Sequence, residues 1–271
     1  MNWFIEMERR LQMSINSYLQ DLSSNLVLSS NEKGGITTSI NSIKDKLASY
    51  FGDEIIEKIV FGSYTRETIL PRKADENSDI DLMIVFKNPN NYKPQSFLNR
   101  LKSFAENKYS RSEVYQSSPT IVLELNHIKF ELVPAYMECG CLYYIPKNSS
   151  EWMYTNPNSF NEKLIECNKK NSYKIKPIVR LLKHWNIQQN SRQLSSYQLE
   201  DKIANEMTYS YITCTSYTDY LKNALSKLRT YYNATNVDKC ISKIDEALKY
   251  EEDNMPYTAM SKIKEVFPEV K

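Results

Sequence analysis

The chain is organised around residues 61–86, FGSYTRETILPRKADENSDIDLMIVF. This stretch begins with a Gly-Ser pair at Gly62 and Ser63, continues through a polar loop, and ends in an apolar run that contains Asp79 and Asp81. β-Branched and aromatic residues dominate the apolar run, which predicts a buried or half-buried strand. Because successive side chains on a strand alternate between its two faces, both aspartates are expected on the same face.

The two aspartates predict a metal site. Neighbouring carboxylates on one strand face repel each other unless a cation lies between them. Asp79 and Asp81 offer only oxygen ligands, and such a pair suits Mg²⁺ or Mn²⁺. Asp-x-Asp at the start of a strand is also common as a plain solvated edge. A metal site of this kind further requires a third carboxylate on another strand.

The Gly-Ser pair predicts a phosphate cradle beside the carboxylates. Residues 59–61 read as a short strand, and Gly62-Ser63 turns out of it. A glycine at this turn lets a phosphate approach the backbone, and Ser63 is expected to cap a helix whose free N–H groups face the anion. The pair alone is also typical of an ordinary turn. Cradle and carboxylates together indicate a metal-dependent nucleotidyl-transfer site.

Bulk composition narrows the class of protein. The 271 residues are 41% hydrophobic and 25% charged, as in ordinary globular proteins. A net charge of only +2 provides no global basic field, so no stable nucleic-acid partner is expected. The N-terminus lacks the pattern of a signal peptide, and no window predicts a membrane span. Five scattered cysteines and two histidines argue against zinc, and a cytoplasmic protein with reduced thiols is expected.

The periodicity predicts an α+β fold in which a sheet with helices is followed by helices alone. Before residue 145, helices are expected at 4–26, at 36–50 after a break at Gly34-Gly35, and at 94–108, with strands at 112–116, 120–125 and 128–133. Asn126-His127 predicts a tight hairpin between the last two strands. From Pro146 onward, helices are expected at 156–170, from Pro177, and at 217–231, 237–248 and 257–267.

Four strings in the chain resemble a known family. Gly62-Ser63 followed by DIDL at residues 79–82 resembles the signature of the DNA polymerase β-like nucleotidyltransferase superfamily. GSYTRETILPR, NSDIDLMIVF, NHIKFELVPAY and RLLKHW resemble the bacterial cGAS-like (CD-NTase) enzymes, relatives of oligoadenylate synthase. The resemblance covers residues 36–200. It implies a polymerase β-like core over residues 1–145, with a mixed or antiparallel sheet and helices behind it, and a helical domain over 146–271 that closes the active-site cleft.

The resemblance also implies which residues act in the core. Glu131 in FELVPAY stands where the family usually has aspartate, and is expected to join Asp79 and Asp81 as the third catalytic carboxylate and metal ligand. Glu124 is a weaker substitute, because its surroundings match no family motif. Arg66 joins the Gly-Ser pair among the expected nucleotide-binding residues.

In the helical part, Lys183 in RLLKHW stands at the family's triphosphate-binding lysine. Ser196 and Tyr197 match the residues that touch the triphosphate and stack on the nucleobase. On a helical wheel Lys183 shares one side with Lys176 and Arg180, and a solvated basic face is the other interpretation of that side.

The predicted function is nucleotidyl transfer: a hydroxyl attacks the α-phosphate of an NTP or dNTP and pyrophosphate leaves, with two Mg²⁺ or Mn²⁺ ions bound. The resemblance implies a cyclic or linear oligonucleotide second messenger, made in bacterial antiphage defence and passed to a separate effector protein. Alternatives are a linear (deoxy)oligonucleotide, in one version begun on a tyrosine such as Tyr250 or Tyr257, and transfer to tRNA or a small molecule. A nucleotide sensor or scaffold on an inactivated fold is the non-enzymatic alternative.

Overall fold

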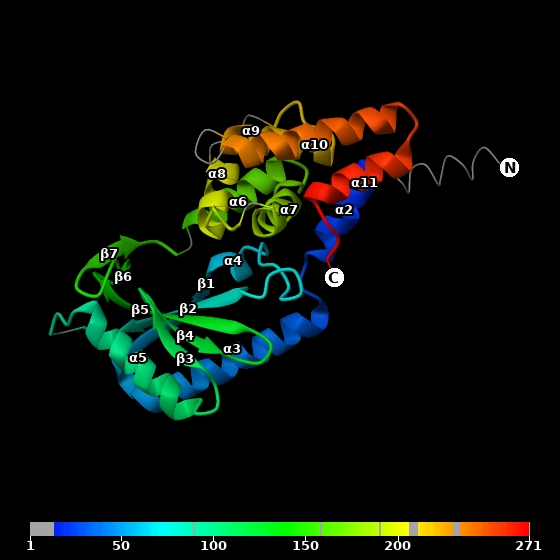
Figure 1. Ribbon diagram of the computed structural model, residues 1–271. Coiled ribbons are helices and arrows are strands. Elements are labelled where there is room, and N and C mark those ends of the chain that lie inside the picture. Colours follow the sequence, from blue (N-terminus) through cyan, green and yellow to red (C-terminus); the bar gives the residue numbers. More distant parts are fainter. Residues whose placement is uncertain are drawn as a thin grey trace. The chain divides into compact units, whose positions relative to one another are not determined.

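The computed structural model describes residues 14–88, 90–157, 159–189, 191–205, 211–229 and 234–270 (Figure 1). These residues form two compact units, and neither is continuous in sequence. The sheet unit contains Leu28–Arg72 and Glu76–Asn161, and the helical unit contains the segment up to Val27, Lys73–Asp75 and the chain from Glu162 onward.

A seven-stranded mixed sheet forms the centre of the sheet unit. Its strands are β1 (Ile55–Phe61), β2 (Asp79–Phe86), β3 (Val114–Ser117), β4 (Thr120–Glu124), β5 (Lys129–Glu138), β6 (Leu142–Pro146) and β7 (Trp152–Thr155). The main path runs β1-β2-β5-β4-β3, and β6 pairs with both β5 and β7. Among the strand pairs of the described residues only β2–β5 is parallel, and the β4–β5 hairpin confirms the turn predicted at residues 126 and 127.

Two long helices cover one face of this sheet, α3 (Ser30–Phe51) and α5 (Pro94–Lys108) (Figure 1). The alternate residues of β2 that face them are fully buried: Ile80, Leu82, Ile84 and Phe86. The same core takes in Phe130 and Leu132 of β5. Because side chains alternate along a strand, the residues between them point to the opposite face. The predicted period-2 pattern of β2 is therefore confirmed, and the α+β fold class with it.

Helix α3 corrects the predicted break at Gly34-Gly35, because the helix runs through both glycines. It begins after Ser29, whose hydroxyl accepts from the Glu32 amide at 3.2 Å while the Glu32 carboxylate accepts from the Ser29 amide at 2.8 Å. This reciprocal cap fixes the helix start one turn ahead of the glycines, and such caps are worth about 1 kcal/mol. Gly52, with φ at +54°, ends the helix as predicted.

We expect Gly34→Ala to stabilise the protein by about 0.5 to 1 kcal/mol, because a helix-interior glycine loses more backbone entropy on folding than alanine does. A Cβ at Gly34 would meet nothing within 4 Å. Denaturant unfolding would measure the change. Gly140→Ala is the matched control: it also meets no neighbour, but its φ of +72° makes it destabilising. A Gly34→Ala protein no more stable than the parent would contradict this account of α3.

Strands β6 and β7 were not predicted: no strand was expected after residue 133, and helices were expected from Pro146 onward. β7 is short and pairs only with β6, and three tyrosines, Tyr136, Tyr144 and Tyr154, lie in register across the two pairings. The rings of Tyr136 and Tyr144 are stacked, with centroids 5.0 Å apart. Cross-strand aromatic pairs of this kind stabilise a sheet edge that the hydrophobic periodicity of so short a segment does not reveal.

The helical unit is built from α2 (Ile15–Asn25), α6 (Ser159–Lys170), α7 (Ile175–Gln188), α8 (Ser196–Asn205), α9 (Tyr217–Leu228), α10 (Ala234–Glu252) and α11 (Pro256–Val266), with α6 entering it at Glu162. Ser14 caps the N-terminus of α2, so this helix begins later than predicted, and residues 4–13 of the predicted helix lie outside the described residues. None of the helices in the described part of the chain has the length and apolar character needed to cross a bilayer.

Candidate active site

The turn after β1 brings a glycine against a carboxylate. Gly62 is buried, has φ at +76°, and begins the one-turn helix α4 (Gly62–Thr65). A Cβ at this position would lie 2.7 Å from Cγ and 3.1 Å from Cβ of Asp81, and closer still to one carboxylate oxygen. Only glycine fits both the backbone conformation and the space. The Gly-Ser turn is therefore in direct contact with Asp81, which lies 19 positions after Gly62 in the sequence.

Ser63 does not cap α4, which corrects one prediction. The N-cap position is Phe61, and no side chain caps the helix. Ser63 lies inside the turn instead, and its carbonyl accepts from the amides of Thr68 at 3.0 Å and Ile69 at 3.1 Å. These two bonds fold the following loop back on the turn and fix the backbone beside Gly62.

The three predicted carboxylates share one sheet face, opposite the helices α3 and α5. Asp79 and Asp81 alternate with the buried Ile80 and Leu82 on β2. In the parallel register of β2 and β5, Asp81 pairs with Glu131, so these two side chains are neighbours on that face. All three carboxylates are partly exposed. Glu131 thus does not point into the core.

Protein groups already contact two of these carboxylates. The Lys129 ammonium lies 3.8 Å from Oδ2 of Asp79, and Thr120 donates to Oε2 of Glu131 at 3.4 Å. Tyr115 lies near one of these acids, Glu131: burial raises the pKa of Tyr115, and the carboxylates of Glu124, Glu113 and Glu131 raise it further. Lys129, Thr120 and Tyr115 were not predicted, because their proximity to the acids depends on the pairing of β5 with β2 and β4 and on the pairing of β4 with β3.

The ligand atoms on this face are carboxylate oxygens, which is the type of ligand that suits a divalent cation. Mg²⁺ and Mn²⁺ prefer oxygen ligands, and the face offers two aspartates on one strand with a glutamate beside the second. Glu124 also faces this side, but it forms an ion pair with Arg72 at 3.7 Å. Across the described residues, no group of three His, Cys, Asp or Glu side chains is gathered closely enough to hold a metal ion.

Arg66 follows α4 and is 7% exposed. Its guanidinium carbon lies 5.1 Å from the centroid of the Phe160 ring, a cation–π contact within the sheet unit. Because Arg66 directly follows the turn that begins at Gly62 and Ser63, it is still a candidate for binding nucleotide.

The basic side of α7 is not a solvated face. Arg180 and Lys183 are 8% and 4% exposed, and both sides of the helix are buried because α2, α8 and α9 all contact it. Arg180 donates to the Ser23 carbonyl at 3.3 Å, and Lys183 forms an ion pair with Glu200 of α8. Burial also lowers the pKa of His184, against the smaller opposing effect of its bond to the Pro268 carbonyl.

Ser196 and Tyr197 form the first turn of α8 and are exposed, with 56% of Tyr197 accessible. Ser195 precedes them and caps the helix: its hydroxyl accepts from the Gln198 amide at 3.1 Å, and the Gln198 side chain accepts from the Ser195 amide. The helix start is therefore fixed while the two predicted ligand-binding side chains remain accessible.

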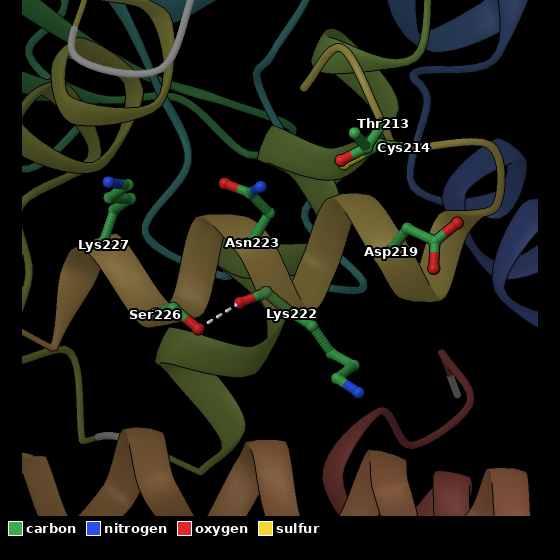
Figure 2. A pocket seen from close by; sticks show the side chains of 7 residues that line it. All are labelled: Thr213, Cys214, Asp219, Lys222, Asn223, Ser226 and Lys227. Atoms are coloured by element: carbon green, nitrogen blue, oxygen red, sulfur yellow. Dashed lines mark hydrogen bonds between the residues drawn. The ribbon is translucent and has the colours of Figure 1, made fainter. Parts of the chain in front are cut away.

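Two pockets lie away from these residues. One of about 340 Å³ follows α9, where Asn223 and Lys227 project on the side of Cys214 (Figure 2). The other, of about 540 Å³, lies in the sheet unit beside Arg100 and Lys87, at the end of β2 remote from Asp79. Neither pocket contains a predicted site residue.

The fold and the glycine-aspartate contact define a nucleotidyltransferase-type core, and comparison with known proteins identifies its family. The family model of the Second Messenger Oligonucleotide or Dinucleotide Synthetase (SMODS) domain matches residues 13–168. The chain belongs to this family of CD-NTase nucleotide second messenger synthases, which are nucleotidyltransferases. Membership implies the use of divalent metal ions.

Two curated relatives are similar over most of the chain. A probable cyclic nucleotide synthase of Bacillus cereus is 26% identical over 279 aligned positions, which cover 80% of this chain and 82% of the relative. The cyclic AMP-AMP-AMP synthase of an Acinetobacter species is 23% identical over 206 positions, covering 73% of this chain and 60% of the relative.

Solved structures share the fold at low sequence identity. Escherichia coli CdnC, solved in complex with a HORMA protein, has a TM-score of 0.72 at 12% identity, covering 93% of this chain and 96% of that one. The CdnE cyclic dinucleotide synthase of Elizabethkingia meningoseptica, solved with GTP and Apcpp, has a TM-score of 0.63 at 16% identity, covering 93% and 98%. These matches extend over both units of the chain.

Proposed function

We propose that this protein joins nucleotides into a cyclic or linear oligonucleotide second messenger, with Asp79, Asp81 and Glu131 as its catalytic carboxylates. The contact between Gly62 and Asp81 is the main support for the proposal. It places a turn whose backbone a phosphate can approach directly against the acidic strand. The register of Asp81 with Glu131 adds the third acid on the same face. Family membership supports the reaction class.

Asp79 and Asp81 would hold the divalent cations, and Glu131 would complete the ligand set on the acceptor side. Bound cations of this kind neutralise triphosphate charge and lower the pKa of an attacking hydroxyl. The chain itself does little covalent chemistry in such a reaction, so its residues act by binding and orienting. Gly62 lets the phosphates approach the backbone, and Ser63 lies beside it in the turn. Arg66 supplies positive charge next to that turn.

The helical unit would contribute the remaining nucleotide contacts. We propose that Lys183 and Ser196 bind the triphosphate and that Tyr197 stacks on the base. The exposed tyrosine ring offers a π-face that accepts any base, so this contact does not by itself select the nucleotide.

The biological setting follows the relatives. We propose that the product acts in bacterial antiphage defence and is read by a separate effector protein. The two curated relatives are described as cyclic nucleotide synthases, which favours a cyclic product for this chain.

An incorporation assay tests the function. With Mg²⁺ or Mn²⁺ and labelled NTPs, singly and mixed, we expect pyrophosphate release and a product that resists phosphatase, as a ring without terminal phosphates does. Linkage-specific nucleases then assign the linkages, and parallel dNTP reactions and mass spectrometry of the protein test linear and tyrosine-primed products. If no nucleotide is incorporated while calorimetry shows NTP binding, the enzymatic proposal is wrong and the protein is a nucleotide sensor.

A further inference from the structure

An ion pair joins α7 and α8 of the helical unit, and its two side chains are shielded from solvent. Nζ of Lys183 contacts Oε1 of Glu200, and the two side chains are 5% and 0% exposed. An ion pair on the surface is far more exposed than this one: the side chains of Lys170 and Glu166 are both more than half exposed. Lys183 is the residue proposed above to bind triphosphate, whereas Glu200 has no role in that proposal.

Stability does not explain this pair. Removing two charges from water costs several kcal/mol for each ion, and their attraction offsets this only in part. Replacing a buried ion pair with apolar side chains of similar volume is often neutral or stabilising. The α7–α8 interface could therefore be at least as stable without the two charges, and their presence indicates another role.

The position of Glu200 suggests that role. It lies one turn after Ser196 on α8, so the two residues are on the same side of the helix. Through Glu200, the Lys183 ammonium is tied to the same helix whose first turn presents Ser196 and Tyr197. The three proposed nucleotide contacts of the helical unit are thereby connected by one side chain.

The fold of this region does not depend on the pair alone. Asn186 of α7 donates to the Leu194 carbonyl at 2.8 Å and accepts from the Leu194 amide at 3.2 Å. The Arg192 amide also donates to the Asn186 carbonyl at 2.9 Å. These bonds attach the segment before α8 to α7 independently of Glu200, so a Glu200 variant can keep α8 in place.

We propose that Glu200 is a positioning residue that holds the Lys183 ammonium in register with the first turn of α8, so that Lys183 and Ser196 together bind a nucleoside triphosphate. This assignment rests on the proposed function. It distinguishes two kinds of nucleotide contact. Glu200 affects phosphate binding by holding Lys183 in place, whereas Tyr197 stacks on the base.

The test compares ATP and AMP binding to Glu200→Gln and the unmodified protein by calorimetry with Mg²⁺ present. AMP retains the base, the sugar and one phosphate. We expect Glu200→Gln to weaken ATP binding by about tenfold to a hundredfold, as for a lost contact between charged groups. AMP binding should change less than about twofold, since Tyr197 keeps its place. Glu200→Asp should restore part of the ATP affinity.

A second set of variants separates positioning from folding. Lys183→Met with Glu200→Leu replaces the pair with apolar side chains, and the double variant should keep the melting temperature of the parent while ATP binding stays weak. Asp245→Asn, which removes one partner of the exposed Lys222–Asp245 pair in the same unit, should change neither property. Recovery of full ATP affinity in the double variant would overturn the assignment.

Three other results would also overturn it. Equal ATP affinities of the Glu200→Gln and unmodified proteins would remove the positioning role and leave the proposed function standing. Equal losses of ATP and AMP binding would show that Glu200 only maintains the fold. Absence of ATP binding in the unmodified protein would instead overturn the proposed function, and this assignment with it.

Discussion

Asp81→Asn is expected to lower the rate of nucleotide incorporation by about a thousandfold while leaving the protein folded. The substitution keeps the size of the side chain and removes its charge. A carboxylate that holds a catalytic cation contributes several kcal/mol of charge stabilisation in the transition state, and each 1.36 kcal/mol is a factor of ten in rate. The Asp79→Asn variant should lose activity to a similar extent.

The Asp81→Asn protein should keep the melting temperature of the parent to within a few degrees. Asp81 is partly exposed, and asparagine keeps the shape of the side chain and one of its acceptor oxygens. Asp79→Asn also removes the charge that pairs with Lys129, so its melting temperature should fall slightly further. A large loss of rate with little loss of stability distinguishes a functional carboxylate from a structural one.

Measurement of the incorporation rate with saturating Mg²⁺, together with the melting temperature, tests this prediction. Glu106→Gln is the matched control, since it removes one charge from α5, in the layer behind the sheet, where the side chain is 54% exposed. The control should match the parent in both measurements. Full activity in an Asp79→Asn, Asp81→Asn double variant would show that these aspartates are not catalytic.

The strongest sequence signals in the fold were local ones. The alternation in residues 80–86 predicted β2, and Pro94 with its apolar stripe predicted α5 over Pro94–Lys108. Helix α3 was predicted too short, because a cap at Ser29 outweighs two glycines in its first turns. The buried basic side of α7 was missed because a helical wheel assumes one solvent face, whereas three helices surround α7. The domain limits at residues 1–145 and 146–271 stay a prediction.

The candidate site also has some features that the sequence predicts and others that only the structure shows. Period-2 alternation is enough to place Asp79 and Asp81 on one face. The adjacency of Asp81 and Glu131 requires the parallel pairing of β2 with β5, which brings together strands 50 residues apart and is not encoded in either strand alone. The contact of Lys129 with Asp79 depends on the same pairing, and the contact of Thr120 with Glu131 depends on the pairing of β4 with β5, so both could be found only in the structure.

Gly62→Ala is expected to have the largest combined effect, with a loss of both stability and activity. Two costs add at this position. The left-handed backbone conformation, with φ at +76°, costs a non-glycine residue about 1 to 3 kcal/mol. The new methyl group would also overlap the Asp81 carboxylate, whose Cγ lies 2.7 Å from the Cβ position, so the carboxylate must move. Displacing a metal-binding carboxylate by about 1 Å is enough to lower a rate by about a hundredfold.

Gly52→Ala separates these two costs. Gly52 also has a positive φ, at +54°, but a Cβ there meets nothing within 4 Å. This variant should lose about 1 to 3 kcal/mol of unfolding free energy and keep its incorporation rate per folded molecule. If Gly52→Ala lost activity as severely as Gly62→Ala, backbone strain alone would explain both, and the contact with Asp81 would have no special role.

A double-mutant cycle then measures the contact itself. In Gly62→Ala combined with Asp81→Ala, the carboxylate is gone and the nearest remaining atom of residue 81 is Cβ, at 3.1 Å. Part of the unfolding free energy lost in Gly62→Ala should therefore return, giving a coupling of at least about 0.5 kcal/mol, while activity stays absent because Asp81 is missing. Additive losses would mean that the two positions do not touch. Recovered stability with absent activity would show that the glycine is there to make room for the carboxylate.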